Sequence, residues 1–351
     1  MVGKTTLFNL LTHAGAEISA YMSGKTAANI GHASVPDDRL IYLSAMFKPK
    51  KTIYAQIEVI DVPGLAQGSY RENSNDFLAA VRNVDALVHV VRAFAGGRST
   101  FAEKGPDLLR DIDTLNTELL FADLALIETR QHRLSGGKKK RPEHPLEEPT
   151  LLKCQAFLEE EKPLKLLELD EEEQAALRHI SFLTNKPMLL VVNLDESQIS
   201  DGEYPGKEQV EAFCREQQME LITISAKMEE EIEELDPEER EIFLSELGLS
   251  ERGLSRVARA VYRQLGLISF LTAGEDEVRA WTIKKDTIAK TAAGKVHTDI
   301  ERGFIRAETV AFEQLKAAGS MAEARHKGYF RLEGKEYVVQ DGDIINFRFN
   351  I

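Results

Sequence analysis

The chain has 351 residues, 43% of them hydrophobic and 29% charged, and a formal net charge of −14. This is the profile of a soluble globular protein with room for two or three domains. The acidity argues against DNA binding and against nucleic-acid binding over the whole surface. The longest apolar runs are too short to span a bilayer, so no membrane association is expected. The two cysteines, Cys154 and Cys214, lie far apart in sequence and are expected to be free thiols in a reducing cytoplasm.

The first residues contain the second half of a phosphate-binding pattern. Gly3, Lys4 and Thr5 supply the end of G-x-x-x-x-G-K-[ST], and an apolar stretch predicts a helix over residues 5–15. The triplet alone is equally consistent with an ordinary helix. The pattern's first glycine and its preceding strand do not occur in the sequence. We therefore expect the chain as written to bind nucleotide weakly, and an upstream extension to restore binding.

The next predicted elements are a loop and a buried strand. Residues 16–36 are rich in Gly, Ala and Ser and predict a loop. Residues 53–61 form an apolar, β-branched run that ends in Asp61, followed by Pro63 and Gly64. An aspartate at the end of a buried strand can hold the water shell of Mg²⁺ beside phosphates. Because glycine has no side chain, Asp-x-x-Gly also lets a backbone N–H approach the terminal phosphate.

Residues 76–84 predict a helix, and residues 85–91 predict a second buried strand. His89 lies inside this apolar run and is interpreted as a packed core histidine rather than a catalyst. Residues 95–105 then form a glycine-containing loop.

From residue 106 to residue 185 the composition changes. Leucines recur at helical spacing, Ser135-Gly136-Gly137 interrupts them, and helical periodicity returns at residues 151–160 and 171–183. This pattern predicts an antiparallel helical hairpin inserted into the α/β domain. Its basic tip at residues 138–141 is the best candidate for an electrostatic contact with RNA.

Two further buried strands end in polar motifs. Residues 187–192 lead into Asn193-Leu194-Asp195-Glu196, and residues 220–225 lead into Ser225-Ala226-Lys227. In a GTPase the motif Asn-Lys-x-Asp reads guanine, because the aspartate accepts from N1–H and the 2-amino group. Here leucine replaces the lysine and glutamate replaces the aspartate. Adenine lacks the 2-amino group, so a site that prefers or admits ATP is physically reasonable.

The predicted domains are residues 1–105 plus 186–266 for the nucleotide-binding domain, residues 106–185 for the helical hairpin, and residues 267–351 for a small α+β domain. In this last part basic and acidic residues balance. Short strands are expected there at residues 278–283, 309–312, 329–332, 336–339 and 344–349. A domain of this kind is more often a binding module than a catalytic one.

The ordered motifs resemble the YchF family of Obg-related P-loop ATPases and GTPases over essentially the whole chain. The densest match is carboxyl-terminal, in Phe270 to Thr282, His297 to Glu308 and Tyr337 to Asp343, which resemble the family's TGS domain. The resemblance implies a P-loop NTPase sheet with an inserted helical hairpin and a β-grasp-like TGS domain. It also implies a cytoplasmic, ATP-preferring protein that associates with the ribosome or ribosomal RNA through the hairpin and the TGS domain.

The resemblance also assigns roles by position. The implied phosphate, metal and catalytic residues are Gly3, Lys4 and Thr6 around the phosphates, Thr5 and Asp61 for Mg²⁺ with Thr26 as a further candidate ligand, and Lys4 and Gly64 for catalysis. The implied base-binding residues are Asn193, Leu194, Glu196, Ser225 and Ala226. Leu65 cannot orient water as a glutamine would, and residues 95–105 contain no histidine. Another group must therefore position the water, or turnover is slow.

These observations favour a Mg²⁺-dependent nucleoside triphosphatase that prefers ATP and regulates translation or a stress response. Two alternatives stay open. One is a catalytically degenerate module that binds the ribosome or a protein. The other is a true GTPase, which needs Glu196 to recognise guanine.

Overall fold

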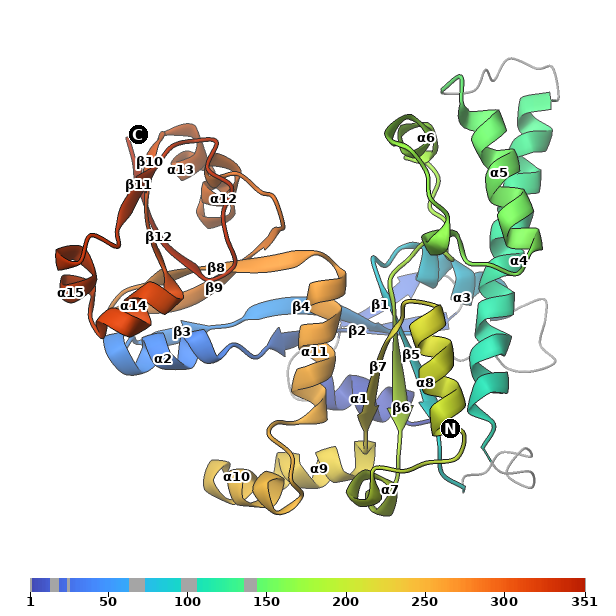
Figure 1. Ribbon diagram of the computed structural model, residues 1–351, viewed down its shortest axis with the longest axis horizontal. Helices are drawn as coiled ribbons and strands as arrows, with labels where there is room; N and C mark the ends of the chain where they lie inside the picture. Colours follow the sequence, from blue (N-terminus) through green and yellow to red (C-terminus); the bar gives the residue numbers. More distant parts are fainter. Residues whose placement is uncertain are drawn as a thin grey trace. The chain divides into compact units, whose positions relative to one another are not determined.

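A computed structural model describes residues 2–12, 19–23, 26–62, 73–95, 106–135 and 144–350 (Figure 1). The chain divides into two compact units. The first consists of Met1–Leu10, Ala14–Gly31 and Ile60–Leu254, and the second of Leu11–His13, His32–Val59 and Ser255–Ile351. No helix in the described ranges is both long enough and apolar enough to cross a membrane.

The first unit is α/β, as the sequence predicts. Its elements, wholly or for the most part, are α1 (Lys4–Leu11), β1 (Ser19–Ser23), β2 (Thr26–Val35), α3 (Asn73–Arg82), β5 (Leu87–Arg92), α4 (Leu108–Ser135), α5 (Glu147–Glu159), the 3₁₀ helix η2 (Leu164–Leu166), α6 (Glu171–Leu177), β6 (Met188–Asn193), α7 (Glu196–Asp201), α8 (Lys207–Glu216), β7 (Glu220–Ile224), α9 (Ala226–Glu234) and α10 (Pro237–Glu246).

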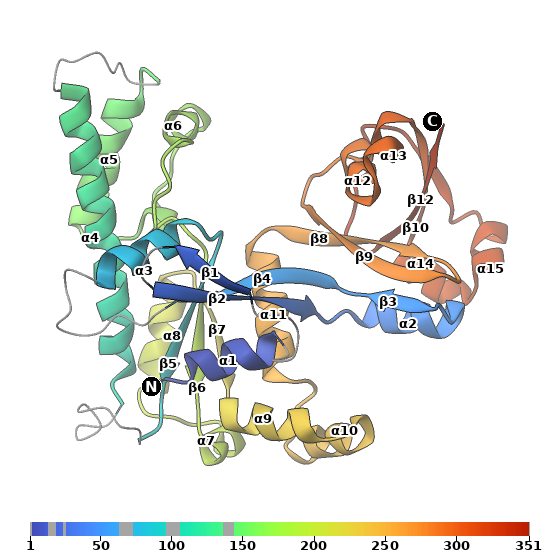
Figure 2. The ribbon, with the colours of Figure 1, turned by 180° about the vertical axis from the view of Figure 1, so that it is seen from behind.

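A parallel sheet in the order β5-β6-β7 forms the centre of this unit. Every residue of the middle strand β6 is buried, which explains its uninterrupted apolar run. Residues of β5 and β6 pack with Ile112 and Leu119 of α4 and Val210 of α8 in one core cluster. Figure 2 shows α1 beside this sheet. Because the strands are parallel, the ends of β6 and β7 reach the same edge and place their polar motifs together.

Aspartate caps determine where several helices of this unit begin. Asp170, Asp195 and Asp236 precede α6, α7 and α10, and each accepts a hydrogen bond from the backbone N–H three residues later. In each case the side chain of that later residue binds back to the cap, which completes a capping box.

The inserted hairpin is present: α4 and α5 run side by side in both views (Figures 1 and 2). Their shared core includes Ile127, Leu151 and Leu158. The last predicted helix, over residues 171–183, is shorter than expected, because α6 ends at Leu177. The backbone N–H groups of Leu183 and Thr184 instead donate to the buried carboxylate of Asp123 on α4, at 2.9 and 2.8 Å. These contacts replace the helical ones and fix α4 to the segment before β6.

The prediction of a loop over residues 16–36 is wrong. Strands β1 and β2 form an antiparallel hairpin in which Ser19 lies opposite Ile30, and the sheet continues in the order β1-β2-β4. Along the end of β2, buried Ala33 and Val35 alternate with the exposed His32. This period of two identifies a half-buried strand, but small residues make the pattern hard to see in the sequence.

The second unit contains the carboxyl-terminal region and one distant segment. Its elements are α2 (Asp38–Phe47), β3 (Lys51–Ile53), most of β4 (Ala55–Asp61), most of α11 (Gly253–Gln264), β8 (Leu267–Ala273), β9 (Glu277–Lys284), α12 (Ala289–Val296), α13 (Thr298–Arg302), β10 (Phe304–Ala311), α14 (Phe312–Ala318), α15 (Met321–His326), β11 (Arg331–Glu333) and β12 (Asp343–Phe349).

A mixed sheet in the order β11-β10-β12-β8-β9-β3 forms this unit. Strand β3 pairs in parallel with β9, so residues 51–53 extend a sheet otherwise built from residues beyond 266. The alanine-rich α12 packs on Phe270 and Ile283. The predicted strand at residues 336–339 is wrong, because Val338 makes only an isolated bridge to Ile288. Strand β8 was not anticipated by the sequence pattern.

Candidate nucleotide-binding site

The expected phosphate end brings the first helix to the end of β4. The Lys4 ammonium lies 3.0 Å from Asp61 Oδ1 and also donates to the carbonyl oxygen of Val62. The Thr5 hydroxyl donates to Asp61 Oδ2 at 3.1 Å. The structure therefore gathers the lysine, hydroxyl and carboxylate that the sequence places 56 or 57 residues apart.

Gly3 has a positive φ of 90°, which places it in the region of backbone conformation that favours glycine. A Cβ atom at this position would overlap the side-chain amide nitrogen of Asn193. Glycine is therefore required at residue 3 both for its backbone angle and for its contact with the end of β6. The neighbouring Thr6 is half-buried on α1.

Asn193 connects three segments of the site. Its amide nitrogen donates to the carbonyl oxygen of Val2 at 3.0 Å, and its amide oxygen accepts from the backbone N–H of Ala226 at 3.0 Å. The side chain is almost completely buried, as are Ser225 and Ala226. Ser225 begins α9, since its hydroxyl accepts from the N–H of Met228. Asn193 thus links the residue before Gly3 to the loop after β7.

The next two residues of the motif are Leu194, which is buried, and Asp195, whose carboxylate already accepts hydrogen bonds within the chain. Leu194 is 3% exposed and packs in the core of the first unit, so its side chain does not occupy the place of a base-stacking lysine. Asp195 caps α7 through Gln198 N–H at 2.9 Å and also accepts from the Ser197 hydroxyl at 2.8 Å. These hydrogen bonds lower the pKa of Asp195.

Glu196 does not present an unpaired carboxylate. Its Oε1 atom accepts a hydrogen bond from the ammonium of Lys227, the third residue of Ser-Ala-Lys. This contact and the charge of Glu196 raise the pKa of Lys227. Both side chains are exposed, so the pair can open when a ligand competes for either partner. The carboxylate at the guanine-reading position is therefore paired with a lysine of this chain.

His89 lies on β5, and Nδ1 of its ring is buried without a hydrogen-bond partner in the described ranges. Burial lowers the pKa of His89 to about 4. The ring is therefore neutral near pH 7, and the residue is half-buried on the sheet rather than fully enclosed in a core.

Other predicted site residues lie outside the described residues. Gly64 and Leu65 lie in the gap at residues 63–72, and nearly all of the loop predicted at residues 95–105 falls in another. The basic tip at residues 138–141 is likewise not described. Thr26 pairs with Ser23 in the β1–β2 hairpin, but its side chain is not described.

The oxygen atoms of Asp61 and its neighbour Thr5 suit a magnesium ion bound with a nucleotide. Magnesium prefers oxygen ligands and is usually held by one or two protein groups plus waters and phosphates. Thr5 Oγ1 and the Asp61 carboxylate supply those oxygens side by side. The described residues contain no cluster of three or more His, Cys, Asp or Glu side chains suited to a metal.

Sequence reasoning missed Lys227 and the backbone carbonyls of Val2 and Val62 as members of the site. A signal for Lys227 was present, because it directly follows two predicted base-binding residues and carries a charge opposite to that of Glu196. The carbonyl contacts had no sequence signal, because any residue can supply a backbone oxygen.

The comparisons with known proteins agree with these motifs. A family described as "50S ribosome-binding GTPase" matches residues 1–120, and the carboxyl-terminal family of YchF GTPases, described as a protein of unknown function, matches residues 267–350. The "Ribosome-binding ATPase YchF" of Bacillus subtilis strain 168 is 45% identical, and that of Escherichia coli O157:H7 is 40% identical. Both alignments cover 100% of this chain and 97% of the relative.

A solved structure described as the Schizosaccharomyces pombe YchF GTPase shares 29% sequence identity and superimposes with a TM-score of 0.86. The superposition covers 99% of this chain and 95% of the yeast chain. The motifs, the fold and the full-length similarity lead to one assignment. This chain belongs to the YchF family of P-loop nucleotide-binding proteins.

Proposed function

We propose that this protein is a Mg²⁺-dependent P-loop triphosphatase that hydrolyses ATP in preference to GTP and regulates translation or a stress response at the ribosome, in the cytoplasm. The observation that carries the proposal is the convergence of Lys4, Thr5 and Asp61 at one end of the site with Asn193 at the other. These residues come from distant parts of the sequence, and a merely structural helix would not need them together.

Lys4 is the group best placed to stabilise charge on the transferred phosphoryl group. In the structure its ammonium is held by Asp61 and by the Val62 carbonyl oxygen. A bound triphosphate would replace these acceptors, because its oxygens carry more negative charge and lie closer to the reacting centre. When bound, magnesium would neutralise part of the phosphate charge, with Thr5 and Asp61 as the residues that hold it. Gly64 would contribute a backbone N–H to the terminal phosphate.

Two features of the base end support a preference for ATP. The carboxylate of Asp195 already accepts a hydrogen bond as the cap of α7, and that of Glu196 is paired with Lys227. Guanine recognition needs a carboxylate that accepts from two N–H groups at once, and an unsatisfied guanine edge would lose those hydrogen bonds. Adenine makes no such demand. Asn193, Ser225 and Ala226 would still surround the base, with Leu194 contributing only backbone.

The names of the relatives support the ribosome as partner, since the Bacillus and Escherichia proteins are called ribosome-binding ATPases. We propose the hairpin at residues 106–185 and the domain at residues 267–351 as the contacting parts. On the latter, the Arg279 guanidinium lies 3.9 Å from the centroid of the Trp281 ring, and both side chains are half-buried. Stacked arginine and aromatic groups of this kind suit RNA bases and phosphates.

Release of γ-phosphate from millimolar Mg·ATP by the wild-type chain and by Lys4→Ala tests the triphosphatase proposal. Because Lys4 is the side-chain cation that the described residues place at the phosphate end, we expect its removal to reduce the rate about 10²-fold or more. Lys207→Ala is the matched control. Lys207 pairs with Glu203 and makes no contact with Lys4, Thr5 or Asp61 in the described residues, so its loss should leave the rate unchanged.

Equal phosphate release by wild type and Lys4→Ala would contradict the proposal and favour the alternative of a catalytically degenerate binding module. Absence of any heat of nucleotide binding in calorimetry would contradict it as well. Competition between ATP and GTP in the same calorimeter tests the base preference separately. Tighter binding of GTP would identify a true GTPase.

A further inference from the structure

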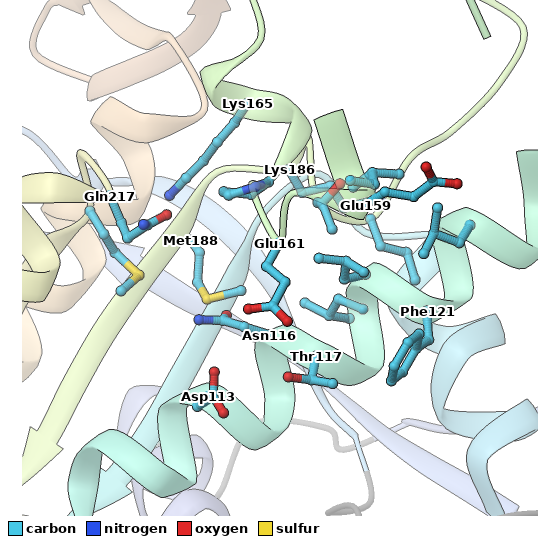
Figure 3. Close-up of a pocket in the computed structure, with 18 of the residues that line it drawn as sticks. Asp113, Asn116, Thr117, Phe121, Glu159, Glu161, Lys165, Lys186, Met188 and Gln217 are labelled. Atoms are coloured by element: carbon cyan, nitrogen blue, oxygen red, sulfur yellow. The ribbon is translucent and has the colours of Figure 1, made fainter. Parts of the chain in front are cut away.

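A pocket of about 430 Å³ lies inside the first unit, away from the residues of the nucleotide site (Figure 3). Its walls come from α4 and the end of α5 on one side, and from the start of β6 and the end of α8 on the other. This volume is within the range of sites for small organic molecules. The pocket therefore has the size of a ligand site at the junction between the hairpin and the sheet.

Part of the pocket surface is apolar. The half-buried Leu120, Leu124 and Phe213 line it, and Met188 and Met219 are 9% and 8% exposed. Leu119, Leu158 and Leu183 are at most 1% exposed and pack behind this surface. Phe121 lines the same pocket and is 61% exposed. A hydrocarbon chain or ring could therefore lose much of its contact with water against this surface.

One cation of the pocket has no partner among the residues that the structure describes. Lys165 is half-buried, and its ammonium makes no hydrogen bond or ion pair with any residue in the described ranges. Burial lowers the pKa of Lys165. The pocket's other lysine, Lys186, already donates to the carbonyl oxygens of Arg82 and Val84. Lys165 is therefore the cation that a ligand could neutralise.

The polar groups of the pocket are unevenly distributed. Figure 3 shows the Lys165 side chain extending toward the Gln217 amide, while Asp113, Asn116 and Thr117 come from α4. No carboxylate in the described part of the pocket forms an ion pair with Lys165. Three acids, Asp113, Glu159 and Glu161, line the pocket together with two lysines, so a ligand with several negative charges would be repelled and a single negative charge must be placed beside Lys165, the lysine without a partner among the described residues. This arrangement suits one negative charge attached to an apolar body.

We propose that this pocket binds a small amphipathic monoanion, with its carboxylate between Lys165 and Gln217 and its hydrocarbon part against the leucine and methionine side chains. Charge neutralisation of Lys165 supplies the orientation, and burial of hydrocarbon supplies most of the affinity. The inference does not depend on the proposed triphosphatase activity, because it uses none of the residues of that site.

Isothermal titration calorimetry with sodium decanoate, below its micelle concentration, tests the proposal on the full chain. Wild-type protein should give saturable binding of one decanoate. Lys165→Met keeps the length of the side chain but removes its charge, and should weaken binding about tenfold or more. Decanol should bind the wild-type protein as weakly as decanoate binds this variant. Lys162→Met is the control, since Lys162 is exposed, pairs with Glu160 and does not line the pocket.

A second variant, Thr117→Trp, fills the pocket from the half-exposed face of α4 and leaves Lys165 in place. It should abolish decanoate binding while circular dichroism confirms a folded protein. Three results would overturn the inference: no saturable binding to the wild type, unchanged binding to Lys165→Met, or unchanged binding to Thr117→Trp. Tighter binding of decyltrimethylammonium than of decanoate would also overturn it, because the acidic side chains would then determine the ligand.

Discussion

The two ends of the proposed nucleotide site are built differently. At the base end, Asn193, Ser225 and Ala226 are at most 5% exposed and are held by hydrogen bonds to the backbone. At the phosphate end, Thr5 is exposed and the Lys4 side chain is 35% exposed. There the charged groups pair with one another instead of bonding to buried backbone groups.

This difference separates the part of the site that the fold determines from the part that a ligand must rearrange. The base end follows from the packing of β6 and β7, so its shape should persist with or without nucleotide. In the Lys4–Asp61 pair the carboxylate is only 7% exposed, but the Lys4 side chain is 35% exposed, so a ligand can reach the ammonium. A triphosphate can therefore compete with Asp61 for Lys4. We expect changes at the buried residues of the base end to affect both stability and binding.

Asn193→Ala should have the largest effect of the base-end changes. It leaves the Val2 carbonyl and the Ala226 N–H without their side-chain partner. Because these groups are largely buried, we expect a loss of about 2–3 kcal/mol in the free energy of unfolding. Loss of the link to Gly3 should also weaken ATP binding about tenfold. Urea unfolding and calorimetry measure the two effects.

Asn346→Ala is the matched control for this prediction, because Asn346 is exposed on β12. Its effect on stability should stay within about 0.5 kcal/mol. If Asn193→Ala were as stable as that control, the base end would not be fixed by the packing of the sheet, and the contrast between the two ends would disappear.

Lys227→Met should have a smaller effect, on specificity alone. Without the ammonium, the Glu196 carboxylate becomes available to the N–H groups of guanine. Because both side chains are exposed, the pair is weak, so the ratio of GTP to ATP affinity should rise only about fivefold or less. Competition calorimetry measures the ratio.

Lys207→Met provides the comparison for the specificity change, since it breaks the similar Lys207–Glu203 pair. An unchanged ratio in Lys227→Met, with ATP binding retained, would show that Glu196 is not kept from guanine by Lys227. Loss of binding to both nucleotides would instead show that Lys227 contacts the nucleotide itself.

The smallest predicted effect is a pH dependence from His89 on β5. Its pKa is about 4 in the folded chain and about 6.5 when unfolded, so the unfolded state takes up a proton first as the pH falls. Stability from the neutral ring is complete above pH 6.5 and is lost between about pH 6.5 and 4. Because the ring is half-buried, we expect the free energy of unfolding to fall by only about 1 kcal/mol between pH 7 and pH 5.

Urea unfolding at pH 7 and pH 5 measures this change in the free energy of unfolding with pH. His89→Gln should lose less stability than the wild type between the two pH values, whereas the exposed His326→Gln should match the wild type. Identical slopes for wild type and His89→Gln would mean that the ring is hydrated in the folded protein.

The sequence was most informative where one physical signal was strong. The apolar run of β6 predicted a fully buried strand, and the leucine spacing of α4 predicted a long helix. It failed at β2, where small residues hide the alternation, and at the end of α6, where the distant Asp123 takes the backbone donors. The site residues could be named from their motifs, but the Glu196–Lys227 pair depends on two strand ends meeting, which spacing alone does not show.

The segment His32–Val59 has a consequence for deletion experiments. It leaves the first unit, contributes α2 and β3 to the second, and returns along β4 to Asp61. A protein that ended at residue 266 would lose β9, the partner of β3, and Lys50 would lose its ion pair with Asp276. Such a shortened protein would carry an unpaired strand and a partly uncovered helix in the segment that leads to Asp61. Any loss of activity in it would then reflect damage to the nucleotide site as well as removal of the carboxyl-terminal domain.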